Sequence, residues 1–117
     1  MKSVFDYVVA NGDIVHKDEL KFPFLDFGYL YGYGLFESIR VENGVPLLLK
    51  EHINRMRRGS IILDIPFDYS NENIEAKVLE QIEKNNAKQS ILNLYLTPGD
   101  RTEDPAVMDI QEPFFLM

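Results

Sequence analysis

Two Asn-Gly dipeptides, each placed between short apolar segments, constrain the fold of this chain more than any other feature. They are Asn11-Gly12 and Asn43-Gly44. Both residue types adopt positive φ at low cost, which suits the tight primed turns of β-hairpins. The flanking segments that should form the paired strands are residues 5–10, 13–15, 35–41 and 46–49. The sequence therefore predicts two β-hairpins.

Two segments with apolar residues at helical spacing follow the second hairpin. The first covers residues 50–63, and the second begins at a cap, Ser70 or Asn71, and ends near Asn85-Asn86. Their predicted apolar faces consist of Leu49, Ile53, Met56 and Ile61 in the first and Ile74, Val78, Leu79 and Ile82 in the second. The spacing predicts two helices that pack on a sheet.

The last third of the chain returns to β-structure. Residues 90–97 and 112–117 read as strands, with a turn at residues 98–101 between them. Strands first, then helices, then strands is the order of an α+β fold. We expect a two-layer sandwich with an antiparallel sheet and two helices on one face.

Length and composition narrow the class of protein. A chain of 117 residues is the size of one domain, and we treat residues 1–117 as one. The net charge of −7 argues against a nucleic-acid partner, because phosphate backbones need a basic surface. No signal peptide or membrane span is recognisable, and the absence of cysteine suits a reducing compartment, so a cytoplasmic location is predicted. His16 and His52 have no metal-ligand spacing, and no metal site is predicted.

Residues 26–37 form the most unusual segment, with three glycines and five aromatic residues between two predicted elements. One interpretation is a tight loop in which the glycines allow positive φ or close approach and the aromatic rings fill the core. The other is a loop that lines a ligand pocket, with backbone brought close to the ligand. The spacing of the glycines matches neither of the common nucleotide-binding motifs.

A basic cluster at residues 51–58 stands out in an acidic chain. It is either a solvated helix face or the source of an arginine that points inward and binds a phosphate group. His52 lies three residues before Arg55 and therefore on the same face of the helix. A histidine with a structural partner is the simpler interpretation of His52.

Together these segments resemble the N-terminal domain of class IV aminotransferases, which include branched-chain aminotransferases, D-amino acid aminotransferases and aminodeoxychorismate lyases. The resemblance rests on Asn43-Gly44, Glu51-His52, Arg55 and the run Asp26-x-Gly28-Tyr29-Leu30-Tyr31-Gly32-x-Gly34-Leu35-Phe36-Glu37-Ser38-Ile39-Arg40-Val41. The Asn11-Gly12 strand, Ile65-Pro66 and residues 90–99 occur in the order expected for that domain. The resemblance thus covers essentially the whole chain.

The resemblance implies pyridoxal 5'-phosphate (PLP) as cofactor and Arg55 as the residue that binds its phosphate. A rigid cationic fork suits a dianion. Phe36 matches a position that lines the substrate side-chain pocket, and Tyr31 and Arg40 match pocket positions of the branched-chain members. Family members are homodimers with composite active sites, so Tyr31 would serve the neighbouring subunit. Glu37 also matches a family position, and we interpret it as structural.

The chain departs from the family pattern at several positions. Phe27 stands where arginine is common and Tyr33 where aspartate is common, so the salt links of the loop should differ. Pro98 replaces an arginine, and Leu92 and Leu94 replace polar pocket residues of the branched-chain enzymes. The choice of substrate therefore does not carry over.

Members of the family continue into a larger domain that carries the lysine that binds PLP covalently and the acid that pairs with the pyridinium nitrogen. Neither has a counterpart in these 117 residues. The lysines of the chain, none of which matches a catalytic position, are Lys2, Lys17, Lys21, Lys50, Lys77, Lys84 and Lys88. Because PLP chemistry needs that anchor and that charge, the chain alone is predicted to be inactive, with no catalytic residue of its own. Arg101 is either a ligand of the substrate carboxylate or a residue of a surface turn.

Two hypotheses from different classes follow. In the first, the chain is the N-terminal part of a PLP-dependent aminotransferase or lyase whose substrate is an amino acid or a 2-oxo acid. In the second, it is a truncated homologue that has lost catalysis and acts as an interaction module. This half of the sequence does not separate transaminase from lyase.

Overall fold

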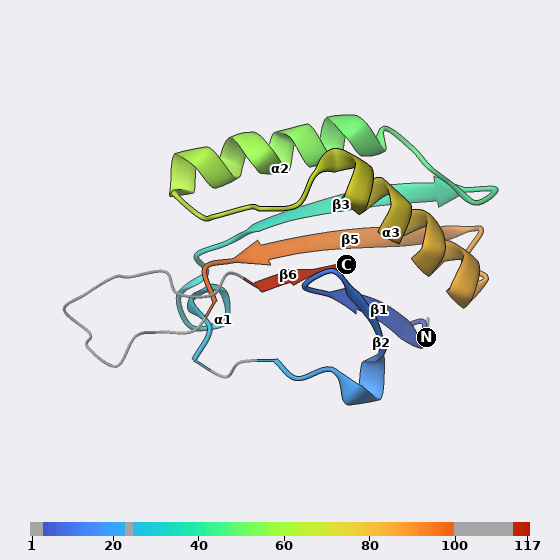
Figure 1. The fold of residues 1–117 in the computed structure, drawn as a ribbon, viewed down its shortest axis with the longest axis horizontal. Helices are drawn as coiled ribbons and strands as arrows, with labels where there is room; N and C mark the ends of the chain where they lie inside the picture. The colour runs from blue at the N-terminus through green and yellow to red at the C-terminus, as the bar shows by residue number, and fades with distance from the viewer. Residues whose placement is uncertain (1–3, 23–24, 100–113) are drawn as a thin grey trace.

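A single antiparallel sheet of six strands organises the computed structural model, which describes residues 4–22, 25–99 and 114–117. The order of the strands is β2-β1-β6-β5-β3-β4, and Figure 1 shows β2, β1, β6, β5 and β3 side by side. The strands are β1 (Tyr7–Ala10), β2 (Asp13–His16), β3 (Leu35–Glu42), β4 (Val45–Pro46), β5 (Ser90–Thr97) and β6 (Phe114–Leu116). The helices are the 3₁₀ turn η1 (Lys17–Glu19), α1 (Phe27–Tyr31), α2 (Leu49–Leu63) and α3 (Asn71–Asn85).

The two long helices, α2 and α3, cover the same face of the sheet (Figure 1). Helix α2 packs on β3, and α3 packs beside β1. In β3 the side chains alternate, so that Glu37, Ile39 and Val41 face the helices while Phe36 and Arg40 lie on the opposite, more exposed face. The predicted α+β sandwich, with an antiparallel sheet and two helices on one face, is confirmed.

Both Asn-Gly dipeptides form the turns that the sequence predicts. Asn11 and Gly12 have φ of 50° and 87°, and Asn43 and Gly44 have φ of 50° and 77°. The first hairpin joins β1 to β2, and the second joins β3 to β4. Asparagine and glycine tolerate this left-handed backbone better than other residues, which explains why these turns were predictable.

The second strand of the second hairpin is shorter than expected. The prediction of a strand over residues 46–49 is wrong beyond Pro46, because Leu48 has a φ of 55° and Leu49 already begins α2. Proline cannot donate a backbone hydrogen bond, so Pro46 suits the edge position that β4 occupies in the sheet.

The boundaries of the helices agree with their capping residues. Ser70 caps α3, since its hydroxyl oxygen accepts a hydrogen bond from the Asn73 backbone N–H at 3.1 Å. Asn86 ends the same helix with a φ of 48°, and Asp64 ends α2 in the same way with a φ of 56°. Side-chain capping at the start and a left-handed residue at the end satisfy backbone groups that a helix leaves open.

Two of the predicted apolar positions are wrong. Ile61 is 76% exposed and Leu79 is 52% exposed. Along α2 the buried positions after Leu49 are Ile53, Met56 and Ser60, so the core position goes to the serine and Ile61 lies about 100° further round the helix. Leu79 is displaced by the same angle from its buried neighbour in α3.

Strand β6 occupies the middle of the sheet although it comes from the far end of the described chain. It pairs with β1 through Ala10 and Leu116 and with β5 through Tyr95 and Leu116. The predicted strands at residues 90–97 and 112–117 are therefore both found, the second as Phe114–Leu116. Residues 112–113, and residues 100–101 of the predicted turn, lie outside the described part.

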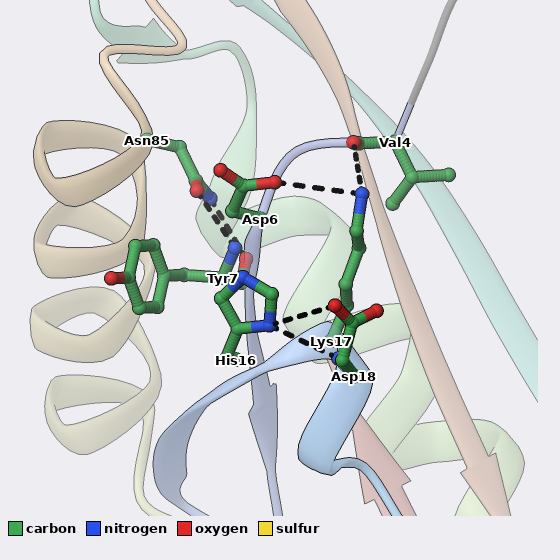
Figure 2. A network of polar contacts seen from close by, with 7 residues as sticks. All are labelled: Val4, Asp6, Tyr7, His16, Lys17, Asp18 and Asn85. Atoms are coloured by element: carbon green, nitrogen blue, oxygen red, sulfur yellow. Dashed lines mark hydrogen bonds and ion pairs between the residues drawn. The ribbon is translucent and has the colours of Figure 1, made fainter.

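The side chain of Asn85 ties the N-terminal hairpin to α3. Its Oδ1 accepts a hydrogen bond from the Tyr7 backbone N–H at 2.9 Å, and its Nδ2 donates to the Tyr7 carbonyl at 2.8 Å. Figure 2 shows the amide of Asn85 facing the backbone of Tyr7, and Lys17, which follows β2, reaching Asp6 and Val4, which precede β1. The amide thus meets the backbone of β1 as a neighbouring strand would.

Candidate functional site

The segment with three glycines and five aromatic residues is built around the short helix α1. Asp26 precedes the helix and is fully buried, and its Oδ1 accepts a hydrogen bond from the Tyr29 backbone N–H at 3.0 Å. The other carboxylate oxygen accepts a hydrogen bond from the hydroxyl of Thr97 at the end of β5. Gly32 ends the helix with a φ of 67°. The segment is thus not wholly an irregular loop, because the Asp26 cap gives it one helical turn.

Gly28 allows α1 to lie directly against β5. A Cβ atom at Gly28 would stand 2.4 Å from Cγ2 of Thr97, closer than any real contact. At the two positions where the loop departs from the family pattern, Phe27 is buried and the hydroxyl of Tyr33 donates to the carbonyl of Leu63 at 2.6 Å. The loop is therefore fastened to the end of β5 by the Asp26–Thr97 hydrogen bond and the close approach of Gly28, and to the end of α2 by the hydrogen bond from Tyr33.

An open, mainly apolar hollow of about 370 Å³ lies between α1, β3 and β5. It is lined by Phe22, Gly28, Tyr29, Gly32, Gly34, Leu35, Phe36, Tyr95, Thr97 and Leu116. The aromatic residues of this segment are divided between the protein interior and the hollow. Phe27 is buried in the protein, whereas Tyr29 and Phe36 are exposed along the hollow.

The predicted substrate residues are only partly brought together. Phe36 lines the hollow, is 70% exposed, and is paired across the sheet with Tyr95. Arg40 lies on the same face of β3, about 13 Å further along the strand, and its guanidinium pairs with Glu42 at 2.7 Å. Tyr31 lies on α1 with its ring centroid 5.7 Å from that of Phe27. Neither Arg40 nor Tyr31 lines the hollow.

Arg55 makes a two-pronged ion pair with Glu37. Its Nε donates to Oε1 at 2.7 Å and its Nη2 donates to Oε2 at 2.6 Å. The ring nitrogen Nδ1 of His52 lies 2.7 Å from the same Oε2. The side chain of Glu37 is 5% exposed and that of Arg55 is 66% exposed, so the carboxylate is inside the protein and the guanidinium reaches out of it.

These contacts change the ionisation of the pair. The hydrogen bond from Arg55 lowers the pKa of Glu37 below its ordinary value of 4.5, and His52 acts in the same direction, while burial opposes both. The hydrogen bond with Glu37 raises the pKa of Arg55 above its ordinary value. Glu37 is therefore an anion at neutral pH, which is how a buried carboxylate with a cationic partner behaves.

The other arginines of the basic cluster have different environments. Arg57 donates through Nη2 to the carbonyl of Tyr69 at 2.7 Å and to Oδ1 of Asn71 at 2.8 Å, and its guanidinium lies over the ring of Phe67. Arg57 thus fastens α2 to the segment that leads into α3. Arg55 differs from Arg57 in that its partner, Glu37, is buried while its own side chain is exposed.

Glu37 is the residue whose partners the sequence analysis missed. A signal for it is present, because Glu37, Ile39 and Val41 alternate along β3 and the last two are apolar. A carboxylate in the buried register of a strand needs a cationic or hydrogen-bonding partner. His52 and Arg55 supply it from the helix that follows.

Three further points concern metal ions, the membrane and Arg101. In residues 4–22, 25–99 and 114–117 no group of three His, Asp or Glu side chains is arranged to hold a metal ion. Within the same ranges no helix has the length and apolar character needed to cross a membrane. Arg101, the candidate carboxylate ligand, falls outside them.

Comparison with known proteins agrees on one family. The model of the family described as amino-transferase class IV matches residues 34–113. A Methanocaldococcus jannaschii protein, named provisionally as a branched-chain-amino-acid aminotransferase, is 37% identical over 94 residues, which are 79% of this chain and 32% of that protein. The chain thus spans about a third of the length of the curated relatives it matches.

Solved structures share the fold. The branched-chain amino acid aminotransferase from Escherichia coli superimposes with a TM-score of 0.87 over 97% of this chain and 40% of that one, at 21% identity. The 4-amino-4-deoxychorismate lyase from Pseudomonas aeruginosa superimposes with a TM-score of 0.71 over 93% of this chain and 37% of that one, at 25% identity.

Proposed function

Because this chain belongs to the class IV aminotransferase family, we propose that it is the N-terminal part of a PLP-dependent aminotransferase that exchanges an amino group between an amino acid and a 2-oxo acid. In this proposal Arg55 binds the phosphate of the cofactor, and Tyr31, Phe36 and Arg40 contribute to the substrate pocket. The observation that carries the proposal is the exposed guanidinium of Arg55 on its buried anchor, Glu37.

The donors of Arg55 fit a phosphate group. A guanidinium has five N–H donors, and Glu37 takes one from Nε and one from Nη2. The remaining three donors are on Nη1 and Nη2, and the side chain of Arg55 is 66% exposed. Planar donors of this kind bind two phosphate oxygens at once. Bound PLP supplies the electron sink for amino-group transfer, and this chain supplies the contact that holds one end of it.

The hollow suits the side chain of an apolar amino acid. Its lining includes Phe36, Tyr95 and Leu116, and burial of apolar surface is the main source of affinity in such a site. Arg40 adds a positive charge on the same face of the sheet. Tyr31 is exposed on α1, and we assign it to the site of the neighbouring subunit in a homodimer.

We propose that these 117 residues do not catalyse amino-group transfer alone. None of their lysines matches the family position that binds PLP covalently. Of the described lysines, Lys17 pairs with Asp6, Lys77 pairs with Glu80, and Lys84 lies over the ring of Tyr7. Lys17 lies in η1, and Lys77 and Lys84 lie in α3, whereas Arg55 lies in α2.

Two alternatives each have an observation in their favour. The likeness to a 4-amino-4-deoxychorismate lyase supports a lyase built on the same domain. The exposed apolar side chains on the open face of the sheet, Phe36, Ile91 and Tyr95, support a non-catalytic interaction module. Activity assays separate the three functions. An aminotransferase transfers an amino group to a 2-oxo acid, a lyase cleaves aminodeoxychorismate, and an interaction module binds without turnover.

The test is binding of PLP and of pyridoxal, which lacks the phosphate, to the 117-residue chain. We expect tighter binding of PLP, loss of that preference in Arg55→Leu, and an unchanged preference in Arg58→Leu, the matched control on the same helix. Thermal unfolding verifies that each variant is folded. Equal affinity for the two ligands in the wild-type chain would contradict the role of Arg55.

The same samples test inactivity. After addition of PLP and borohydride, we expect no stoichiometric labelling of a single lysine in a peptide map. We also expect no amino transfer from branched-chain amino acids or D-alanine to 2-oxo acids. One fully labelled lysine together with turnover would overturn the proposal that the chain is inactive alone.

A further inference from the structure

Glu37 holds Arg55 by one defined side of the guanidinium. The bonds from Nε and Nη2 run to the two carboxylate oxygens at 2.7 Å and 2.6 Å. A two-bond contact of this kind fixes the plane of the group as well as its position. A single hydrogen bond would leave the guanidinium free to turn. The pair thus determines which N–H groups are used inside the protein and which point outward.

The carboxylate is itself held in place. His52 lies one helical turn before Arg55, on the same face of α2, and its Nδ1 is 2.7 Å from Oε2 of Glu37. Glu37 comes from β3 on the buried side of the sheet, next to the core residue Ile39. Two groups from the helix therefore bracket one carboxylate from the strand, which makes the anchor rigid.

The donors that remain form a second fork. Once Nε and one N–H of Nη2 are occupied, the outer N–H of Nη2 and both N–H groups of Nη1 are left. Within the described residues the guanidinium of Arg55 has Glu37 as its partner, and two-thirds of the side chain is exposed. The end of the guanidinium is therefore the part presented to a ligand, in a fixed orientation.

Stabilisation of the fold does not by itself account for the ion pair between Glu37 and Arg55. An ion pair with a buried carboxylate is weak evidence for stabilisation, because desolvation offsets much of the attraction. The negative charge of Glu37 also reduces the attraction of Arg55 for an anion. What the arrangement gains is orientation, because a long arginine side chain otherwise loses rotamer freedom when it binds a ligand.

We propose that Glu37 is a positioning residue, which holds Arg55 side-on so that the outer Nη1/Nη2 edge binds the phosphate of the cofactor. This inference rests on the proposed function of Arg55 and adds a role for a residue that contacts no ligand. The phosphate takes the outer edge, and the bonds to Glu37 persist in the bound state.

The experiment is ¹⁵N NMR of the Nε–H groups of the 117-residue chain, with Arg55→Lys used to assign the Arg55 signal. In the wild-type chain without ligand, we expect solvent exchange of the Arg55 Nε–H to be at least about tenfold slower than that of the exposed Arg58. On addition of PLP or inorganic phosphate, the Nη resonances of Arg55 should shift while its Nε–H stays protected.

Glu37→Gln tests the anchor, and Glu80→Gln, in an exposed ion pair on α3, is the matched control. In Glu37→Gln the exchange of the Arg55 Nε–H should rise to that of Arg58, and the preference for PLP over pyridoxal should fall about threefold to tenfold. Glu37→Asp, which keeps the charge, should restore part of both. Glu80→Gln should change neither.

Five outcomes overturn the proposal. If Glu37→Gln lowers only the unfolding temperature, or if it raises the affinity for PLP, Glu37 is structural or simply repulsive. If the Nε–H loses protection when phosphate binds, the ligand displaces Glu37. A rapidly exchanging Nε–H in a wild-type chain that still prefers PLP overturns this inference alone. A protected Nε–H with no response to any phosphate overturns the proposed role of Arg55 as well.

Discussion

At Glu37, burial and the neighbouring charges act on the pKa of one carboxylate in opposite directions. Its carboxylate is inside the protein, yet its pKa is lowered, because the hydrogen bonds from Arg55 and His52 outweigh the effect of burial. The native state therefore binds this proton less readily than the unfolded chain does. A group of this kind links the stability of the fold to pH.

The stability of the wild-type chain should fall in acid through this residue. Below pH 4.5 the unfolded chain takes up a proton on Glu37 while the native protein does not, so this stabilisation is complete above that pH and is lost as the pH drops through the lowered native value. In Glu37→Gln the free energy of unfolding at pH 7 should be about 1–3 kcal/mol lower, and its decline below pH 4.5 less steep.

Urea unfolding of both proteins between pH 7 and pH 3 measures this difference, with Glu80→Gln as a control that should follow the wild type. Parallel declines for wild type and Glu37→Gln would show that Glu37 does not carry the linkage.

At the scale of elements, the contact between α1 and β5 depends on the absence of one side chain. Gly28→Ala should lower the free energy of unfolding by about 1–3 kcal/mol, because the new methyl group would overlap Cγ2 of Thr97 and crowd the carboxylate of Asp26. Thr97→Ser removes Cγ2 and keeps the hydroxyl that donates to Asp26. The double variant should therefore recover part of the loss.

Urea unfolding of the two single variants and the double variant gives the coupling energy between the two positions. If the effects of Gly28→Ala and Thr97→Ser were additive, the two residues would not be in contact.

Elements whose signals are local could be predicted from the sequence, and those decided by partners could not. The Asn-Gly turns and the Ser70 cap depend on residues within one turn of chain, and both are found. Strand β4 is short because the backbone of Leu48 is left-handed, and no local sequence pattern predicts that conformation for a leucine. Ile61 is exposed because the face of α2 that packs on β3 is narrow and includes Ser60 in place of Ile61.

The candidate site divides in the same way. The sequence motif was enough to single out Phe36 and Arg55 as candidate site residues. The contacts of Glu37 with His52 and Arg55 join a strand to a helix, and they depend on which face of β3 is buried. That choice belongs to tertiary packing. The roles of Tyr31 and Arg40 in substrate binding belong to the proposed function.

At the scale of the whole molecule, α3 joins the N-terminal hairpin to the rest of the sheet. Asn85 bonds to both backbone groups of Tyr7, and Gln81 donates to the carbonyl of Met117 at 3.0 Å. In Asn85→Ala the two backbone groups lose their partners, which should cost about 1–3 kcal/mol and speed hydrogen exchange at the Tyr7 amide before other positions in β1.

Amide hydrogen exchange by NMR measures this effect residue by residue. Asn85→Asp is the informative control, because it can still accept from the Tyr7 N–H but can no longer donate to the Tyr7 carbonyl. An intermediate effect is expected. Unchanged protection of Tyr7 in Asn85→Ala would exclude this attachment.

The central position of β6 also sets an order of events for a chain growing on the ribosome. Asn11 and Phe115, which are bonded in the sheet, are 104 residues apart, and synthesis of that length takes roughly 5–20 s. A lone two-stranded hairpin is barely stable in water. The N-terminal hairpin is therefore translated well before β6, and its pairing in the sheet is not complete until that strand has been made.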